Sequence, residues 1–170
     1  NLAHAQLSKQ FAERRVNKTY LAIVIGNPDC DRDVIKAPIG MHPKQREKMA
    51  VRRDHSTSRA AESFYEVQNR FAGHSLLEIK PRTGRTHQIR VHLAYIGHPV
   101  LCDAVYGHQG SFRESDLKRD GDGEETPVLL HRQALHAISL GFDHPTTGET
   151  MLATAPLPED MQAVLELLKS

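Results

Sequence analysis

KPRTGRTHQIRVH, residues 80–92, is the stretch that says most about the fold of this 170-residue chain. It follows a β-rich segment and leads into a helical one, which is typical of a mixed α+β domain. It carries four basic residues and two histidines but no acidic residue. A loop that enters a helix presents free backbone N–H groups at the positive helix end, here beside Arg82 and Arg85. The stretch therefore predicts a phosphate-binding site.

The helical part of this stretch is expected to begin with Thr86 as its N-cap and to end before Gly97. Ile89 and Leu93 mark its buried face, and Arg90 lies near the edge of that face. A guanidinium group in this place needs an anionic partner, because an unpaired buried charge is very costly. Arg90 is therefore a candidate catalytic-site residue, although a purely structural ion pair would produce the same pattern.

The chain upstream predicts one helix and three strands around a long polar segment. Apolar residues four positions apart predict an amphipathic helix over residues 1–15, and a nearly continuous apolar run predicts a buried strand over 18–26. The polar, basic residues 29–58 predict a loop or a short hairpin. Two further strands, 59–69 and 75–80, are expected to form a hairpin around a turn at 70–74.

The chain downstream predicts a second hairpin and a terminal helix. Residues 107–127 are acidic and show no periodicity, which is typical of a mobile insertion loop. Strands are expected over 129–142 and 149–155, with a short helix near His131, and a final helix is expected from Pro158 onward. This order predicts a single α+β domain with a mixed, mainly antiparallel sheet and flanking helices.

Basic residues are concentrated in two segments of a chain whose formal net charge is only +1. One is the stretch at 80–92, and the other is 41–60, with six basic and two acidic residues. Two such segments on a nearly neutral protein favour a local site for a polyanion, whereas a single one would more often be a solvated face. The candidate polyanion-binding residues of the second segment are Lys44, Arg46, Lys48, Arg52 and Arg53.

Several classes of protein are excluded or disfavoured by missing motifs. The glycines form neither a dinucleotide fingerprint nor a P-loop, and no serine-hydrolase elbow is present. His87 and His92 are five positions apart, as are His131 and His136, so neither pair has the spacing of a helical metal site and no metal is expected. Two isolated cysteines and no long apolar run favour a reducing, cytoplasmic compartment without a membrane.

Tyr20 stands in the apolar strand KTYLAIVIG, residues 18–26. A core tyrosine with a satisfied hydroxyl would explain it. The alternative is a functional ring that stacks on a base, with its phenol close to the reacting group. The residues alone leave both interpretations open.

Four blocks in sequence order resemble the RluA family of pseudouridine synthases, which isomerise uridine in RNA. They are AHAQLSKQFAERRVNKTYLAIVIG (3–26), PRTGRTHQIRVHLAYIGHPVLCDAVYG (81–107), RQALHAISLGFDHPTTGE (132–149) and APLPEDM (155–161). A narrower match, PIGMHPKQREKMAV (38–51), is similar to the subgroup that acts on large-subunit ribosomal RNA. One departure is Cys102, where the family usually has glycine.

This resemblance implies a cofactor-free isomerisation of specific uridines in structured RNA, and the narrower match implies large-subunit ribosomal RNA. Tyr20 matches the tyrosine that lines the uridine pocket, and Arg90 matches the arginine that pairs with the catalytic aspartate. The RNA-facing loop and helix start are matched by Arg85, Thr86, His87 and Gln88.

The family's nucleophilic aspartate lies in an H-R-L-D-x-x-T-S-G motif, which does not occur in residues 1–170. We therefore expect these residues to be the C-terminal part of a synthase catalytic domain, with the aspartate and any S4-type RNA-binding domain upstream. Two alternatives remain: an RNA-binding module without catalysis, and a phosphate-binding metabolic enzyme that uses the helix entry at Gly84–His87.

Overall fold

Residues 2–117 and 126–170 are described by the structure, a computed structural model. The helices are α1 (Leu2–Ala12), α2 (Gln88–Tyr95), α3 (Glu159–Lys169) and the short 3-10 helix η1 (Glu114–Leu117). The strands are β1 (Asn17–Ile25), β2 (Arg32–Lys36), β3 (Ile39–Met41), β4 (Met49–Val51), β5 (Glu62–Phe71), β6 (His74–Pro81), β7 (Phe112–Arg113), β8 (Val128–Leu130), β9 (Leu135–Asp143) and β10 (Thr150–Thr154).

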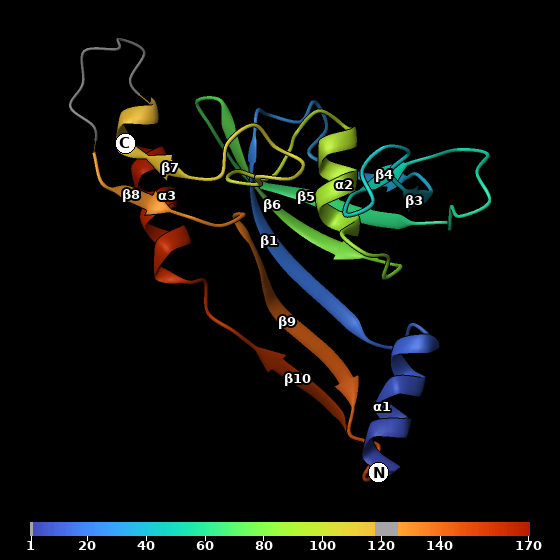
Figure 1. The fold of residues 1–170 in the computed structure, drawn as a ribbon. Coiled ribbons are helices and arrows are strands. Elements are labelled where there is room, and N and C mark those ends of the chain that lie inside the picture. Colours follow the sequence, from blue (N-terminus) through green and yellow to red (C-terminus); the bar gives the residue numbers. More distant parts are fainter. Residues whose placement is uncertain (1, 118–125) are drawn as a thin grey trace.

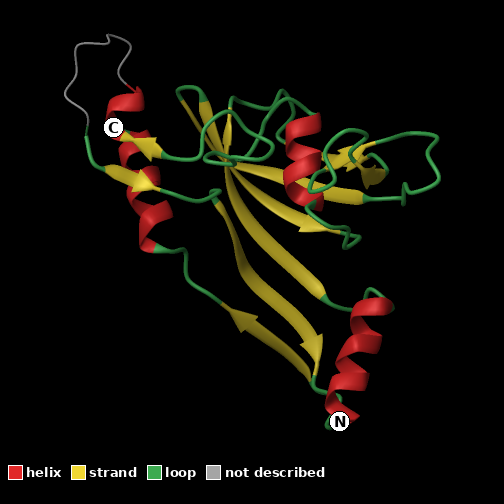
Figure 2. Cartoon of the chain, viewed as in Figure 1, coloured by secondary structure: helices red, strands yellow, loops and turns green. Residues whose placement is uncertain are grey.

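Six strands form one sheet in the order β10-β9-β1-β6-β5-β2, and every neighbouring pair is antiparallel (Figure 1). The apolar strand β1 lies between β6 and β9, as its continuous hydrophobic run indicates. Two small hairpins, β3-β4 and β7-β8, stand outside this sheet. Helices and an antiparallel sheet together confirm the predicted α+β class (Figure 2).

The hydrophobic core lies at the C-terminal half of β1. Ala22, Ile23 and Val24 have no exposed surface, whereas the first five residues of this strand are exposed or half-buried. The buried faces of α2 and α3 belong to the same hydrophobic cluster, through residues that include Leu93 and Val164. The N-terminal half of β1 is thus left accessible, and it is there that the candidate site is found.

In residues 2–87 the predicted helix and strands form with shifted boundaries, and one further strand forms that was not predicted. Helix α1 forms, yet Phe11 of its expected apolar face is 51% exposed and the one buried residue is Gln10, whose amide bonds the backbone of Asp143. Strand β2 was missed because its residues are mostly polar and exposed, as on a sheet edge. The turn between β5 and β6 is only Ala72–Gly73, with Gly73 at φ 75°.

Downstream, the expected long strand at 129–142 is wrong, because the chain bends at residues 131–134 and separates β8 from β9. No helix forms at that bend. The range 107–127 is not irregular throughout, since it contains β7 and η1; residues 118–125 of the predicted loop lie outside the described residues. The terminal helix forms as predicted.

No helix in the described ranges is both long and apolar enough to cross a membrane.

Candidate active site

The turn from β6 into α2 is fixed by one buried glutamine, Gln88. Its Oε1 accepts hydrogen bonds from Thr83 Oγ1 at 2.6 Å and Arg85 N at 3.0 Å. Its Nε2 donates to Glu62 O at 2.9 Å and Ser63 Oγ at 3.0 Å. Thr83 Oγ1 also accepts from Glu62 N. Because these groups are buried and mutually satisfied, they hold the loop against β5.

The start of α2 differs from the sequence prediction. The N-cap is His87 and not Thr86, and no side chain caps the helix. His87 takes a left-handed conformation with φ 54°, an uncommon conformation for a residue with a side chain. The helix end agrees with the prediction, since Gly97 follows the C-cap Ile96 with φ 84°.

Arg90 projects from the first turn of α2 and forms a bidentate ion pair with Asp103. Arg90 Nε lies 2.7 Å from Asp103 Oδ2, and Nη2 lies 2.7 Å from Oδ1. The side chain of Arg90 is 12% exposed and that of Asp103 is completely buried. The guanidinium also lies over the ring of Tyr106, 4.9 Å from its centroid. The anionic partner that Arg90 requires is thus present in this chain, which sequence reasoning missed.

Burial and hydrogen bonding oppose each other at this pair. Burial favours the neutral form of Asp103, but bonds from Arg90, Tyr106 N and Val105 N outweigh it and hold the pKa of Asp103 below its usual value. The same hydrogen bonds to Asp103 raise the pKa of Arg90. Both groups therefore stay charged, and the pair fixes the orientation of the guanidinium.

Tyr106 connects the start of α2 to the β3-β4 hairpin. Its hydroxyl accepts a hydrogen bond from Met49 N and lies 2.9 Å from His87 Nδ1. The hydroxyl can donate to an unprotonated Nδ1 or accept from Nδ1–H, because a phenol is both a donor and an acceptor. Burial and the nearby Arg90 charge lower the pKa of His87, which favours the neutral ring.

A cavity of about 200 Å³ lies where α2, the loop before it and the N-terminal half of β1 meet. It is lined by Tyr20 and Lys18 of β1, Leu135 of β9, and both Gln88 and Arg90 of α2, together with residues of the β6-α2 loop. This volume is below the roughly 300–1,000 Å³ of sites for drug-sized ligands, and it suits a small planar group such as one base. Tyr20 and Arg90, 70 positions apart in sequence, face the same space.

Among the described residues, no aspartate or glutamate lines this cavity. Asp103 cannot act as its nucleophile, because the carboxylate has no exposed surface and both oxygens already accept hydrogen bonds. Arg90 Nη1, by contrast, makes no hydrogen bond within the described ranges 2–117 and 126–170. The cavity therefore supplies an aromatic ring and a guanidinium, but it does not supply a reacting carboxylate.

The other predicted site residues separate into groups. Arg85 and His87 line the cavity with Gln88, whereas Arg82 and Thr86 do not. Arg82 is exposed and pairs with Glu62. The basic residues of the β3-β4 region are not in the cavity lining.

His92 of α2 has a structural role. His92 is fully buried, with Nδ1 bound to Ser63 Oγ and Nε2 to Ala37 O, both at 2.9 Å. Burial lowers its pKa, so the ring is neutral. In the part of the chain that the structure describes, no group of three His, Cys, Asp or Glu side chains could hold a metal ion.

A family model described as RNA pseudouridylate synthase matches residues 1–95. The chain is 44% identical over 167 residues to ribosomal large subunit pseudouridine synthase D of Pseudomonas aeruginosa, covering 98% of this chain and 50% of that protein. It is 40% identical over 168 residues to the protein of the same name from Nitrosomonas europaea, covering 99% and 45%. The chain thus spans about half the length of the curated relatives it matches.

Two solved human structures have a similar fold. RNA pseudouridylate synthase domain containing 4 superimposes with a TM-score of 0.71 and 25% identity, covering 97% of this chain and 67% of that one. RNA pseudouridylate synthase domain containing 1 gives a TM-score of 0.70 and 25% identity, covering 98% and 71%.

Proposed function

This chain belongs to the RNA pseudouridylate synthase family, and from that premise we propose that the full-length protein isomerises specific uridines to pseudouridine in large-subunit ribosomal RNA. The relatives at 40% and 44% identity carry the name of a ribosomal large-subunit synthase, which supports this choice of RNA. Membership of the family also disfavours the alternative of a phosphate-binding metabolic enzyme.

One observation carries the proposal: Tyr20 and Arg90 line a single cavity next to the β6-α2 loop. The resemblance matched Tyr20 to the tyrosine that lines the uridine pocket and Arg90 to the arginine that pairs with the catalytic aspartate. The two residues come from a central strand and a helix far apart in sequence. A ring and a guanidinium in a cavity of about 200 Å³ fit a flipped base and its attacking group. Chemistry on a base inside folded RNA requires such extrusion.

In the proposed reaction, an aspartate upstream of this chain attacks the sugar or the base of the flipped uridine and the N-glycosidic bond breaks. The uracil then turns and rejoins the sugar through C5, and the bond to the aspartate breaks, so that the carboxylate is released unchanged. The proton lost from C5 balances the one gained at N1, so the reaction is an isomerisation and consumes no cofactor.

Arg90 would keep the attacking aspartate ionised through Nη1, while Asp103 holds the other edge of the guanidinium. Tyr20 would contact the uracil ring and take part in removing the C5 proton. Asp103 is thus a positioning residue in this scheme.

Basic residues around the cavity would bind the RNA backbone, which positions the substrate without reading its sequence. The loop before α2 supplies Arg82 and Arg85 with Thr86, and the hairpin region supplies Lys44, Arg46, Lys48, Arg52 and Arg53.

The proposal is tested by measuring pseudouridine formation in large-subunit ribosomal RNA with the full-length protein. Tyr20→Phe, which keeps the ring and removes the hydroxyl, should slow turnover by about 100-fold or more if the hydroxyl acts in proton transfer. Tyr65→Phe is the matched control, because Tyr65 is a buried tyrosine of β5 outside the cavity. Absence of pseudouridine with the wild-type protein would contradict the proposal.

RNA binding without catalysis is the alternative that the same measurement tests. It predicts that the full-length protein binds large-subunit RNA and leaves its uridines unchanged.

A further inference from the structure

Tyr106 contacts both members of the Arg90–Asp103 pair. Its backbone N–H donates to Asp103 Oδ1 at 3.0 Å, and its ring lies under the guanidinium of Arg90, with 4.9 Å between Cζ and the ring centroid. The turn that carries Tyr106 is tight, because Gly107 N bonds to Asp103 O at 2.7 Å and a Cβ on Gly107 would lie 2.7 Å from the same oxygen. The backbone therefore holds this ring close to the ion pair.

The ring of Tyr106 supplies a restraint that the carboxylate of Asp103 does not. The two bonds to Asp103 lie along the Nε and Nη2 edge of the guanidinium and fix that edge. They oppose a tilt of the guanidinium plane only weakly, because hydrogen bonds tolerate moderate changes of angle. An aromatic ring against one face opposes this tilt, and the attraction between cation and ring favours the contact. Ring and carboxylate together restrain the direction of Arg90 Nη1.

The side chain of Tyr106 is itself held from two sides. Its hydroxyl accepts a hydrogen bond from Met49 N at 2.9 Å and lies 2.9 Å from His87 Nδ1. Its ring packs against a small hydrophobic cluster, separate from the main core, that includes Ile39 and Val91. The β3-β4 hairpin and α2 therefore both contribute to the place of this ring.

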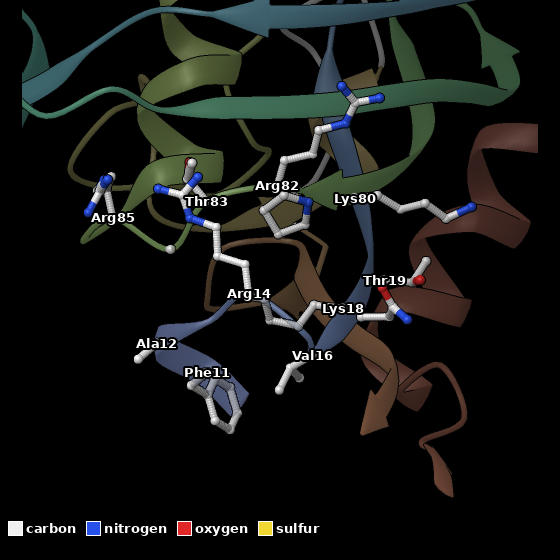
Figure 3. Close-up of a pocket in the computed structure, with 13 residues that line it drawn as sticks. Phe11, Ala12, Arg14, Val16, Lys18, Thr19, Lys80, Arg82, Thr83 and Arg85 are labelled. Carbon is white, nitrogen blue, oxygen red and sulfur yellow. The ribbon is translucent and has the colours of Figure 1, made fainter. Parts of the chain in front are cut away.

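Tyr106 does not line the cavity in which Tyr20 and Arg90 meet. It is also absent from the lining of a second hollow, of about 890 Å³, between the end of α1 and the β6-α2 loop (Figure 3). Its neighbours His87 and Arg90 do line the cavity. An effect of Tyr106 on a reaction in the cavity therefore passes through one of these two side chains, and Arg90 is the one that carries a charge.

We propose that Tyr106 is a positioning residue, whose ring holds the Arg90 guanidinium at the tilt that directs Nη1 into the cavity. Its hydroxyl seats the ring between the β3-β4 hairpin and α2. The inference rests on the proposed function, because it takes Arg90 as the group that meets the attacking aspartate. It gives a role in the reaction to a side chain outside the cavity lining.

The kinetic test measures kcat and KM for pseudouridine formation in large-subunit ribosomal RNA with the full-length protein. Tyr106→Leu removes the ring and should lower kcat about tenfold, the size expected for one cation–π contact, while KM changes by less than about twofold. Tyr106→Phe keeps the ring and should keep kcat within about threefold of the wild type, although the loss of the hydroxyl bonds lowers its stability. A residue that only supports the fold would instead lower kcat in step with stability.

Combination with Arg90→Lys tests whether the ring acts through the guanidinium. An ammonium group has no plane for a ring to orient, so Tyr106→Leu should cost at most about threefold more in the Arg90→Lys background. Tyr95→Leu is the matched control: Tyr95 ends α2, is 51% exposed and is outside the cavity lining, so kcat should not change. An unchanged kcat in Tyr106→Leu, or an equal tenfold loss in both backgrounds, would overturn the inference.

Solvent exchange of the Arg90 Nε–H proton reports on the guanidinium without requiring catalysis. It is measured by NMR and assigned by the loss of the signal in Arg90→Lys. Exchange should be about tenfold faster in Tyr106→Leu and unchanged in Tyr106→Phe. Unchanged exchange in Tyr106→Leu would contradict the positioning role. Faster exchange in that variant, with no pseudouridine formed by the wild type, would contradict only the proposed activity.

Discussion

The two basic segments have similar composition and very different structure. Residues 80–92 contain a buried hydrogen-bond network, in which the side chains of Thr83, Gln88 and His92 all have partners. Residues 41–60 form the β3-β4 hairpin region, where Lys44 and Arg46 are exposed and have no acidic partner among the described residues. Charge pattern alone predicted the same role for both.

This contrast in burial indicates that residues 80–92 need a fixed geometry and that residues 41–60 do not. A hydrogen-bonded guanidinium in a cavity wall is suited to acting on one reacting group, because its position is fixed before substrate arrives. Exposed lysines on a hairpin suit contacts with a flexible backbone, where position matters less than charge. Tyr106 joins the two segments through Met49 and His87, so the hairpin is anchored beside the helix that carries Arg90.

Breaking the Arg90–Asp103 pair should have the largest effect on stability. Arg90→Met leaves a buried, unpaired carboxylate and should lower the free energy of unfolding by about 3–5 kcal/mol in chemical denaturation. Adding Asp103→Asn removes that charge and should recover a substantial part of the loss. Equal stability of the single and double variants would contradict a buried, charged pair.

Gln88 and Gln45 provide a direct comparison of the two segments. Gln88→Ala leaves buried partners unsatisfied and should lower the free energy of unfolding by about 2–3 kcal/mol. The same change at Gln45, an exposed residue of the hairpin, should stay within about 0.5 kcal/mol of the wild type. Thermal unfolding of both variants measures the two losses of stability. Similar losses would contradict the difference between the two segments.

The pH dependence of unfolding should report on Asp103. Its pKa is lowered in the folded protein, so the pair contributes its stability fully above the unfolded-state value of about 3.9. That contribution is lost as the pH falls from there through the folded-state pKa. The free energy of unfolding of Arg90→Met/Asp103→Asn should therefore vary less with pH in this acid range than that of the wild type. An equal pH dependence of the two proteins would contradict a lowered pKa of Asp103 in the folded state.

Single changes in the hairpin should have the smallest effects. Lys44→Gln or Arg46→Gln should leave stability within about 0.5 kcal/mol. Each should reduce the salt slope of RNA binding by about 0.7–0.9, the effect of one phosphate contact. Salt titration of binding measures this slope, and an unchanged slope would show that the residue touches no phosphate.

Element types were predictable from sequence wherever local chemistry decided them. The apolar run of β1 and the Gly97 stop of α2 are such cases. Thr86 was a reasonable N-cap by residue type. The turn is instead fixed by the buried amide of Gln88, which bonds to β5. Sequence spacing does not reveal this contact, because its partners Glu62 and Ser63 are 26 and 25 residues away. Strand β2 looks polar because it is an edge strand, so its pairing with β5 decides its structure.

The site was predictable only in part. Arg90 was a candidate from its place at the edge of a buried helix face, and for Tyr20 a functional role was one of two open interpretations. The family resemblance gave both residues their expected roles, and their common cavity required the fold. The partner of Arg90 was missed because Asp103 is 13 positions away across a turn. The sequence did contain a signal for a turn directly before Asp103, because the family usually has glycine at the position of Cys102. Cys102 has φ 59°, a left-handed conformation that glycine adopts more readily.

In the proposed function, the cavity performs the chemistry and the hairpin region binds the RNA. The most direct test compares Arg90→Lys with the triple change Lys44→Gln/Arg46→Gln/Lys48→Gln in the full-length protein, measuring pseudouridine formation and RNA affinity together. Arg90→Lys should lose at least about 100-fold in kcat with RNA affinity largely retained. The triple variant should weaken affinity and keep kcat at saturating RNA. A loss of affinity equal to the loss of turnover in Arg90→Lys would contradict the account.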